Sequence, residues 1–156
     1  MRGKQAKKRK LDPDAKYGSV TVSKLINYIL KDGKKSVATR LVYSSLESSS
    51  EKLQKDPLVV LDMVIKNVGP LVEVRSHRVG GATYQVPIEV SKNRRLALAL
   101  RWLIQATNDK KGADFATKLS NEMIAAYNNE GNAIKKKIDT HKMADANKAF
   151  AHFAKY

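Results

Sequence analysis

The chain has 156 residues, and its 30 lysines and arginines outnumber its 15 aspartates and glutamates, which gives a formal net charge of +15. The absence of cysteine excludes disulfides, thiolate metal sites and cysteine nucleophiles, and no apolar run approaches the length of about 20 residues that spans a bilayer. We therefore expect a cytoplasmic protein without a membrane partner, folded as a single domain over residues 1–156, whose charge favours a nucleic-acid partner.

The N-terminal ten residues form a strongly basic segment without acidic side chains. Such a segment cannot build an apolar core, so we expect a disordered tail. Residues 1–18 are interpreted as this tail and a linker, punctuated by Asp12-Pro13-Asp14 and Gly18. The tail is predicted to bind RNA or DNA through its total charge rather than through particular pairings. Its cations are Arg2, Lys4, Lys7, Lys8, Arg9 and Lys10.

A first helix is predicted from apolar residues that recur at helical spacing, and it should end near Gly33. These residues are Val22, Leu25, Ile26 and Ile29. Lys34 and Lys35 follow in the connection to the next helix and form a small cluster that could contact phosphates.

The second helix carries Val37, Leu41, Val42 and Leu46 on one face. The serines between residues 44 and 50 are predicted to fall mostly on the opposite face, and the helix should fray near Gln54. A third helix is predicted to start after Asp56, because aspartate can cap free amides and Pro57 is tolerated in the first turn. It should stop at Gly69-Pro70.

Two strand-like runs meet at Gly80-Gly81 and predict a two-stranded hairpin arm over residues 72–90. A two-residue turn would divide the apolar side chains between the two faces, so we favour a three-residue loop, which keeps them together. The apolar set is Val72, Val74, Val86 and Ile88. This register places Arg78 and Tyr84 on the same face, towards the tip. Two roles for Tyr84 stay open, stacking on nucleic acid and bracing the hairpin.

The next helix is predicted to be capped by Ser91 and to have a core side and a cationic side. Arg94 and Arg101 lie on the cationic stripe, and Arg95 and Trp102 lie on its flank. Because Arg94 and Arg95 are near the helix N-terminus, their guanidinium groups and the free amides could converge on one phosphate. Trp102 is interpreted as a core residue rather than a base-stacking platform.

Two further helical segments complete the chain. Phe115, Leu119, Met123 and Tyr127 predict a helix that stops near Gly131. The segment from Asn132 is rich in helix formers but has no clean apolar stripe, so it could lie on a partner instead of in the core. It carries the candidate phosphate ligands Lys136 and Lys142. The predicted fold is a mainly α, single-domain bundle of about six helices with a protruding two-stranded β-hairpin and a disordered basic tail.

The sequence offers no catalytic constellation. Its histidines have no metal-ligand spacing, and it contains neither a Walker-type phosphate loop nor a nucleophile elbow. We expect no enzyme activity, metal, cofactor or small-molecule substrate. The residues alone leave two classes open, an RNA-binding structural protein and a bacterial chromatin-type DNA-binding helical protein, although the second lacks a helix-turn-helix pattern or dimer seam.

Several sequence motifs, taken in their order along the chain, point to a particular protein family. They are Asp32-Gly-Lys-Lys-Ser36, Val42-Tyr43, the run RVGGATYQVPIEV over residues 78–90, Arg94-Arg95, Arg101-Trp102 and the run MADANKAFAH over residues 143–152. From about Leu11 onward, the chain closely resembles the family of bacterial small-subunit ribosomal protein seven.

This resemblance implies a helical bundle with a protruding hairpin that binds the 3′ major domain of 16S rRNA and begins assembly of the subunit head. It also implies a position near exit-site tRNA and mRNA, and contacts with ribosomal proteins nine and eleven. Gly69 and His77 depart from the pattern, because related chains usually carry arginine there. The RNA-facing residues implied by the resemblance are Arg75, Arg78 and Tyr84 of the hairpin with its tip Gly80 and Gly81, then Arg94, Arg95 and Arg101, and the basic tail.

Overall fold

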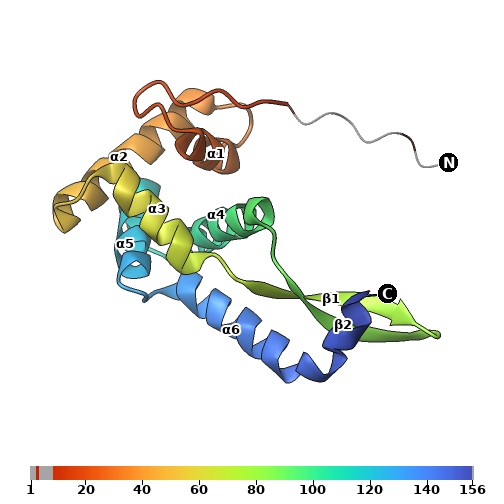
Figure 1. The fold of residues 1–156 in the computed structure, drawn as a ribbon. Helices are drawn as coiled ribbons and strands as arrows, with labels where there is room; N and C mark the ends of the chain where they lie inside the picture. Colours follow the sequence, from red (N-terminus) through yellow and green to blue (C-terminus); the bar gives the residue numbers. More distant parts are fainter. Residues whose placement is uncertain (1–2, 4–8, 156) are drawn as a thin grey trace.

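The computed structural model describes residue 3 and residues 9–155, except for the side chains of residues 154 and 155. Within this part of the chain, the fold is mainly helical with a two-stranded antiparallel hairpin, which confirms the predicted fold class (Figure 1). The elements are α1 (Val20–Ile29), α2 (Lys35–Leu53), α3 (Pro57–Val68), β1 (Val72–Val79), β2 (Ala82–Glu89), α4 (Lys92–Asp109), α5 (Phe115–Tyr127), α6 (Asn132–Ala146) and the 3₁₀ helix η1 (Lys148–Lys155).

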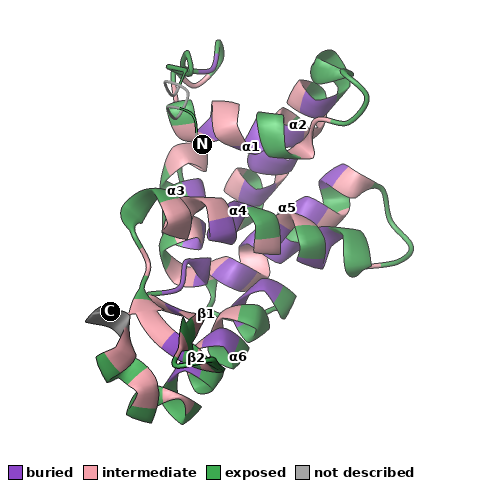
Figure 2. Ribbon diagram, turned by 90° about the vertical axis from the view of Figure 1, so that its right-hand side faces the viewer, coloured by how far each residue is buried: buried purple, intermediate pink, exposed green. Residues whose placement is uncertain are grey.

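The main core lies between the apolar faces of α1 to α5, and α6 closes one end of it (Figure 2). The prediction that the serines of α2 point away from this core is wrong for Ser45 and Ser49, which are fully buried. Their hydroxyls donate to the carbonyl oxygens of Val42 and Leu46, so burial leaves no unpaired donor. Small side chains at these positions also let α5 pack closely on α2.

Helix α1 ends at Ile29, earlier than the predicted end near Gly33, whereas the boundaries of α3 and α4 follow the local signals. The Asp56 carboxylate accepts hydrogen bonds from the backbone N–H groups of Leu58 and Val59, and α3 ends at Val68, directly before Gly69-Pro70, as predicted. Helix α4 begins after Ser91, but the Ser91 side chain makes no capping hydrogen bond within the described residues. The helix therefore starts where we expected without the expected side-chain cap.

The hairpin has a two-residue turn, so the predicted three-residue loop is wrong. Val79 pairs with Ala82, and both turn glycines have positive φ, 58° for Gly80 and 91° for Gly81. This left-handed pair matches the twist of the strands and is favourable for glycine. In this register, the face packed on α6 and η1 carries Glu73 and Val86, whereas Val72 lies on the opposite face. Turn geometry therefore overrides the grouping of apolar side chains.

Helix α6 runs along the hairpin, and η1 folds over β2 (Figure 1). The suggestion that this segment lies on a partner instead of in the core is wrong for the face that holds Ala133, Ile134 and Ala144, which are buried within the chain. Mostly small side chains make this face, and for that reason no apolar stripe is evident in the sequence.

Tyr84 lies under η1. Its ring centroid is 5.3 Å from that of Phe150 and 4.9 Å from that of Phe153. Of the two roles left open for Tyr84, this packing supports bracing, because two phenylalanines of the C-terminal segment contact its ring.

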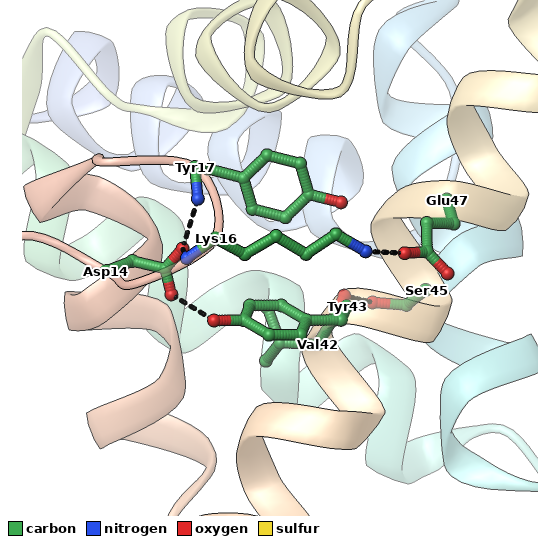
Figure 3. Close-up of polar contacts among 7 residues, drawn as sticks. All are labelled: Asp14, Lys16, Tyr17, Val42, Tyr43, Ser45 and Glu47. Carbon is green, nitrogen blue, oxygen red and sulfur yellow. Dashed lines mark hydrogen bonds and ion pairs between the residues drawn. The ribbon is translucent and has the colours of Figure 1, made fainter.

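The segment that precedes α1 is attached to α2 by a polar network (Figure 3). The buried carboxylate of Asp14 accepts hydrogen bonds from the backbone N–H groups of Lys16 and Tyr17 and from the Tyr43 hydroxyl. The Lys16 ammonium pairs with Glu47 of α2. The last residues of the predicted linker therefore belong to the fold.

A buried carboxylate that the sequence analysis did not single out joins three helices. Glu122 of α5 is fully buried, and its Oε1 accepts a hydrogen bond of 2.9 Å from the Ala133 N–H in the first turn of α6. Its Oε2 lies 2.5 Å from the Lys110 Nζ at the end of α4. A Cβ at Gly131 would lie 2.8 Å from Glu122 Oε1, so glycine leaves the space that the carboxylate occupies.

Candidate nucleic-acid interface

The root of the hairpin and α4 meet at a buried carboxylate, Glu73, whose side chain is only 10% exposed. Its Oε1 accepts hydrogen bonds from Arg75 Nε and Nη2, at 3.1 and 2.9 Å. Its Oε2 accepts hydrogen bonds from Arg94 Nε and Nη2, both at 3.2 Å. We call these three residues the Glu73 cluster. The Arg75 side chain is 61% exposed and that of Arg94 is 42% exposed, so neither side chain is covered by the fold.

Arg95 has a different set of partners. Its Nη2 donates to the Lys66 carbonyl oxygen at 3.0 Å and its Nε donates to the Gly69 carbonyl oxygen at 3.2 Å. These oxygens lie at the C-terminal end of α3, where carbonyls lack helical partners and the helix dipole favours cations. The expectation that Arg94 and Arg95 converge on one phosphate therefore does not describe this arrangement. Glycine at 69 leaves room for Arg95, since a Cβ there would lie 2.7 Å from Arg95 Cγ.

Two side chains of α6, Lys137 and His141, also bind backbone groups at and just after the C-terminal end of α3. Lys137 Nζ donates to the Asn67 carbonyl oxygen at 2.6 Å, and burial followed by the Arg95 charge lowers the pKa of Lys137. The Leu71 N–H donates to His141 Nε2 at 3.1 Å. Burial, then the charge of Lys137, lowers the pKa of His141. Acceptance of this hydrogen bond requires an unprotonated Nε2, which agrees with the direction of the shift.

Arg101 lies over an exposed aromatic ring that the sequence analysis missed. Its Cζ is 5.8 Å from the centroid of Tyr28, which is 37% exposed. Tyr28 lines one surface cavity with Lys24 and another with Lys31 and Lys34. The fold therefore gathers cations from α1, α4 and the α1–α2 connection around one tyrosine. The sequence signal that could have identified Tyr28 is its spacing, four residues after Lys24 and three before Lys31.

The two lysines of the α1–α2 connection do not form one cluster. Both are exposed, but Lys34 lines the cavity that contains Tyr28, whereas Lys35 lines two others with Tyr43. The two lysines therefore belong to different parts of the surface.

At the hairpin tip, Arg78, Gly80 and Gly81 are exposed. Arg78 pairs with Thr83, and His77 pairs with Tyr84, so Arg78 and Tyr84 lie on opposite faces. The expectation that they share a face is wrong, because it depended on the longer loop. A positively charged side chain and a glycine turn thus remain free of the surface that η1 covers.

The remaining candidates are dispersed. Lys136 and Lys142 are exposed on α6, and Lys136 lines a cavity with Trp102. Trp102 is half-buried and packs against the core, as expected. Arg9 and Lys10 are exposed. The other tail residues named above lie outside the described residues; they are Arg2, Lys4, Lys7 and Lys8.

Neither a metal site nor a membrane span is evident in the part of the chain that the structure describes. No three acidic or histidine side chains in residues 3 and 9–155 are grouped so that they could hold a metal ion. None of the helices in the same ranges combines the length and the apolar character that a bilayer crossing requires. The site's chemistry is that of guanidinium and ammonium groups on a rigid scaffold.

Comparisons with known proteins agree on one family. Residues 1–148 match the family described as ribosomal protein S7p/S5e. The chain is 58% identical over 153 residues to small ribosomal subunit protein uS7 of Thermosipho africanus, with 98% of this chain and 99% of the relative covered. The protein of the same name from Thermotoga maritima is 55% identical with the same coverage. That from Geotalea uraniireducens is 50% identical over 97% of each chain.

Proposed function

Because this chain belongs to the ribosomal protein S7p/S5e family, we propose that it binds the 3′ major domain of 16S rRNA and begins assembly of the head of the small subunit. The family is one of ribosomal proteins and not of enzymes. The observation that carries the proposal is the match of 98% of this chain to relatives named small ribosomal subunit protein. We place the protein in the cytoplasm, within the ribosome.

The exposed cations of the described residues are proposed as the rRNA ligands. Arg75 and Arg94 at the hairpin root and Arg101 over Tyr28 come from fixed elements, so their geometry suits recognition of a folded RNA by shape and backbone. Arg95 supports this surface from below through its bonds to α3. Lysines extend the surface in several directions, and the basic tail adds charge. The further ligands are Arg78, Lys34, Lys35, Lys136, Lys142 and the tail cations Arg2, Lys4, Lys7, Lys8, Arg9 and Lys10.

The hairpin tip is proposed to lie near exit-site tRNA and mRNA. Gly80 and Gly81 are exposed and lack side chains, so a nucleic-acid backbone can approach their peptide groups closely. Arg78 supplies charge beside them, and Tyr84 braces the arm through η1. The tip therefore has a turn without side chains, and the strands behind it are held by the packing of Tyr84 on η1.

Ribosomal proteins nine and eleven are proposed as protein neighbours. Three large apolar side chains, Leu71, Ile138 and Met143, are exposed on the hairpin root and α6. With 58%, 46% and 53% of their surface exposed, in that order, these side chains are open to contact with another protein. Crosslinking from cysteines placed at these positions in assembled subunits should capture either neighbour. Crosslinks to rRNA alone would contradict the assignment.

Chemical footprinting of a head-domain fragment of 16S rRNA tests the main proposal. We expect protection of a junction within the 3′ major domain, and competition by duplex DNA of equal charge should not remove it. If about eight phosphates are engaged, log affinity should fall with log salt at a slope of roughly −6. Preference for the duplex would instead indicate a chromatin-type DNA-binding protein, and affinity independent of salt would contradict both.

A further inference from the structure

The acidic member of the Glu73 cluster is unexpected on a surface proposed to bind phosphate. Its negative charge lowers the positive potential beside Arg75 and Arg94, so charge alone predicts that Glu73 weakens RNA binding. Yet the carboxylate is almost fully buried, and each of its two oxygens accepts two hydrogen bonds from one guanidinium group. A buried carboxylate paired in this way holds its partners in place.

We propose that Glu73 is a positioning residue for RNA binding, which fixes the guanidinium groups of Arg75 and Arg94 so that both present their free N–H groups to one stretch of phosphate backbone. This inference rests on the proposed function. Arg75 comes from β1 and Arg94 comes from α4, 21 residues away from Glu73 in the sequence. Their convergence on one carboxyl group therefore exists only in the folded chain.

The geometry leaves binding capacity on both arginines. A guanidinium group has more N–H donors than the Nε and Nη2 groups that bind Glu73, and the unused donors belong to side chains that are 61% and 42% exposed. One phosphate can accept hydrogen bonds from two such groups. The cluster keeps a net positive charge, because two guanidinium groups surround one carboxylate.

Preorganisation is the physical gain. A long arginine side chain loses rotamer freedom when it binds a phosphate, and this ordering reduces affinity. Glu73 imposes the ordering when the protein folds, before RNA arrives. It also joins the hairpin to α4, so that the two elements meet the RNA in one fixed relation.

The test is Glu73→Gln, assayed by binding to the head-domain rRNA fragment over a range of salt concentrations. The substitution raises the net charge by one and keeps the side-chain size, but the amide nitrogen cannot accept a hydrogen bond from an arginine. The positioning role predicts that affinity falls at least about fivefold, from the ordering of two side chains at the lower end of the usual range. Tighter binding than that of the wild type would overturn the proposal.

Glu89→Gln is the matched control. Glu89 is exposed on the same hairpin, pairs with Val72 on the opposite face, and has no ion-pair partner within the described residues. Glu89→Gln changes the net charge by the same amount as Glu73→Gln, so the affinity of this variant for the rRNA fragment should stay equal or rise. An equal loss in both variants would overturn the positioning role.

A double-mutant cycle separates positioning from folding. In a background of Arg75→Ala with Arg94→Ala, Glu73→Gln should no longer lower affinity, because its partners are gone; affinity should stay equal or rise, as for Glu89→Gln. A loss of the same size in that background would assign the effect to general destabilisation and overturn the proposal. If the wild type itself does not bind the rRNA fragment, the proposed function fails instead.

Discussion

Arg94 and Arg95 are adjacent in the sequence, yet their guanidinium groups bind different parts of the fold. Arg94 donates to Glu73 of β1, and Arg95 donates to carbonyl oxygens at the end of α3. One arginine therefore joins the proposed RNA surface to the hairpin, and the other stabilises the bundle beneath it. Substitutions at these two positions should not be treated as equivalent losses of charge.

Arg95→Ala should lower the free energy of unfolding by about 1–3 kcal/mol, because two carbonyl oxygens lose a charged donor. Urea denaturation measures the change. Arg101→Ala is the control: its side chain is exposed on the same helix and contacts Tyr28, so stability should change by less than about 0.5 kcal/mol. Equal stability of the two variants would contradict this assignment.

Lys110→Ala should destabilise the protein by about 3 kcal/mol, because the buried carboxylate of Glu122 loses its ammonium partner; the lower end of the usual range applies, since the Lys110 side chain is partly exposed. Lys111→Ala provides a matched control, since it removes an exposed lysine from the next position. Thermal unfolding followed by circular dichroism compares them. A Lys110 variant as stable as its Lys111 counterpart would show that the carboxylate does not need this partner.

Stability should fall as pH falls through the ordinary histidine range, because the pKa of His141 is lowered in the folded state. Between that lowered pKa and the unfolded value of about 6.5, the unfolded chain binds more protons, so protonation favours unfolding. The facing charges of Lys137 and Arg95 oppose protonation, and Asp145 favours it. The loss should level off below the folded pKa.

Urea denaturation from about pH 8 to about pH 5 covers the range in which an ordinary histidine titrates. His141→Gln should flatten the dependence, and it retains an acceptor for the Leu71 N–H. His152→Gln, which removes an exposed histidine of η1, is the matched control. A His141→Gln profile that coincides with the wild type would assign the pH dependence elsewhere.

Tyr84→Ala should loosen η1 from the hairpin, because the ring contacts both Phe150 and Phe153. Hydrogen exchange of amides in residues 148–155 should become faster, whereas Tyr84→Phe should retain protection, since the ring remains. If Tyr84 served only to stack on RNA, both variants would show the protection of the wild type.

The sequence predicted correctly those features of the fold that are determined by residues close together in the chain. Asp56 and Gly69-Pro70 fixed both ends of α3 correctly because capping and chain termination are local interactions. The predicted hairpin register was wrong, because the grouping of apolar side chains did not anticipate the two-residue turn or the burial of Glu73 against Arg94 of another element. Periodicity could not reveal that an acidic side chain belongs inside.

The candidate site shows the same division. Charge and position marked Lys34 and Arg101 as exposed cations, and the structure agrees. Tyr28 was missed, because an aromatic residue in an amphipathic helix resembles a core residue until its neighbours are placed. Glu122 was missed for a related reason, since its partners Lys110 and Ala133 come from separate segments.

The Glu73 cluster has a consequence for how the arm selects its pairing. Apolar patterning favours a hairpin with Val72 and Val74 inward, and a slip of one residue on β1 would bring them to the packed face. That slip would remove Glu73 from Arg94 and turn its carboxylate to the other face. The ion pairs of Glu73 thus disfavour the shifted register, which the apolar side chains alone would favour. Polar contacts, rather than the most hydrophobic side chains, therefore distinguish the observed register from the shifted one.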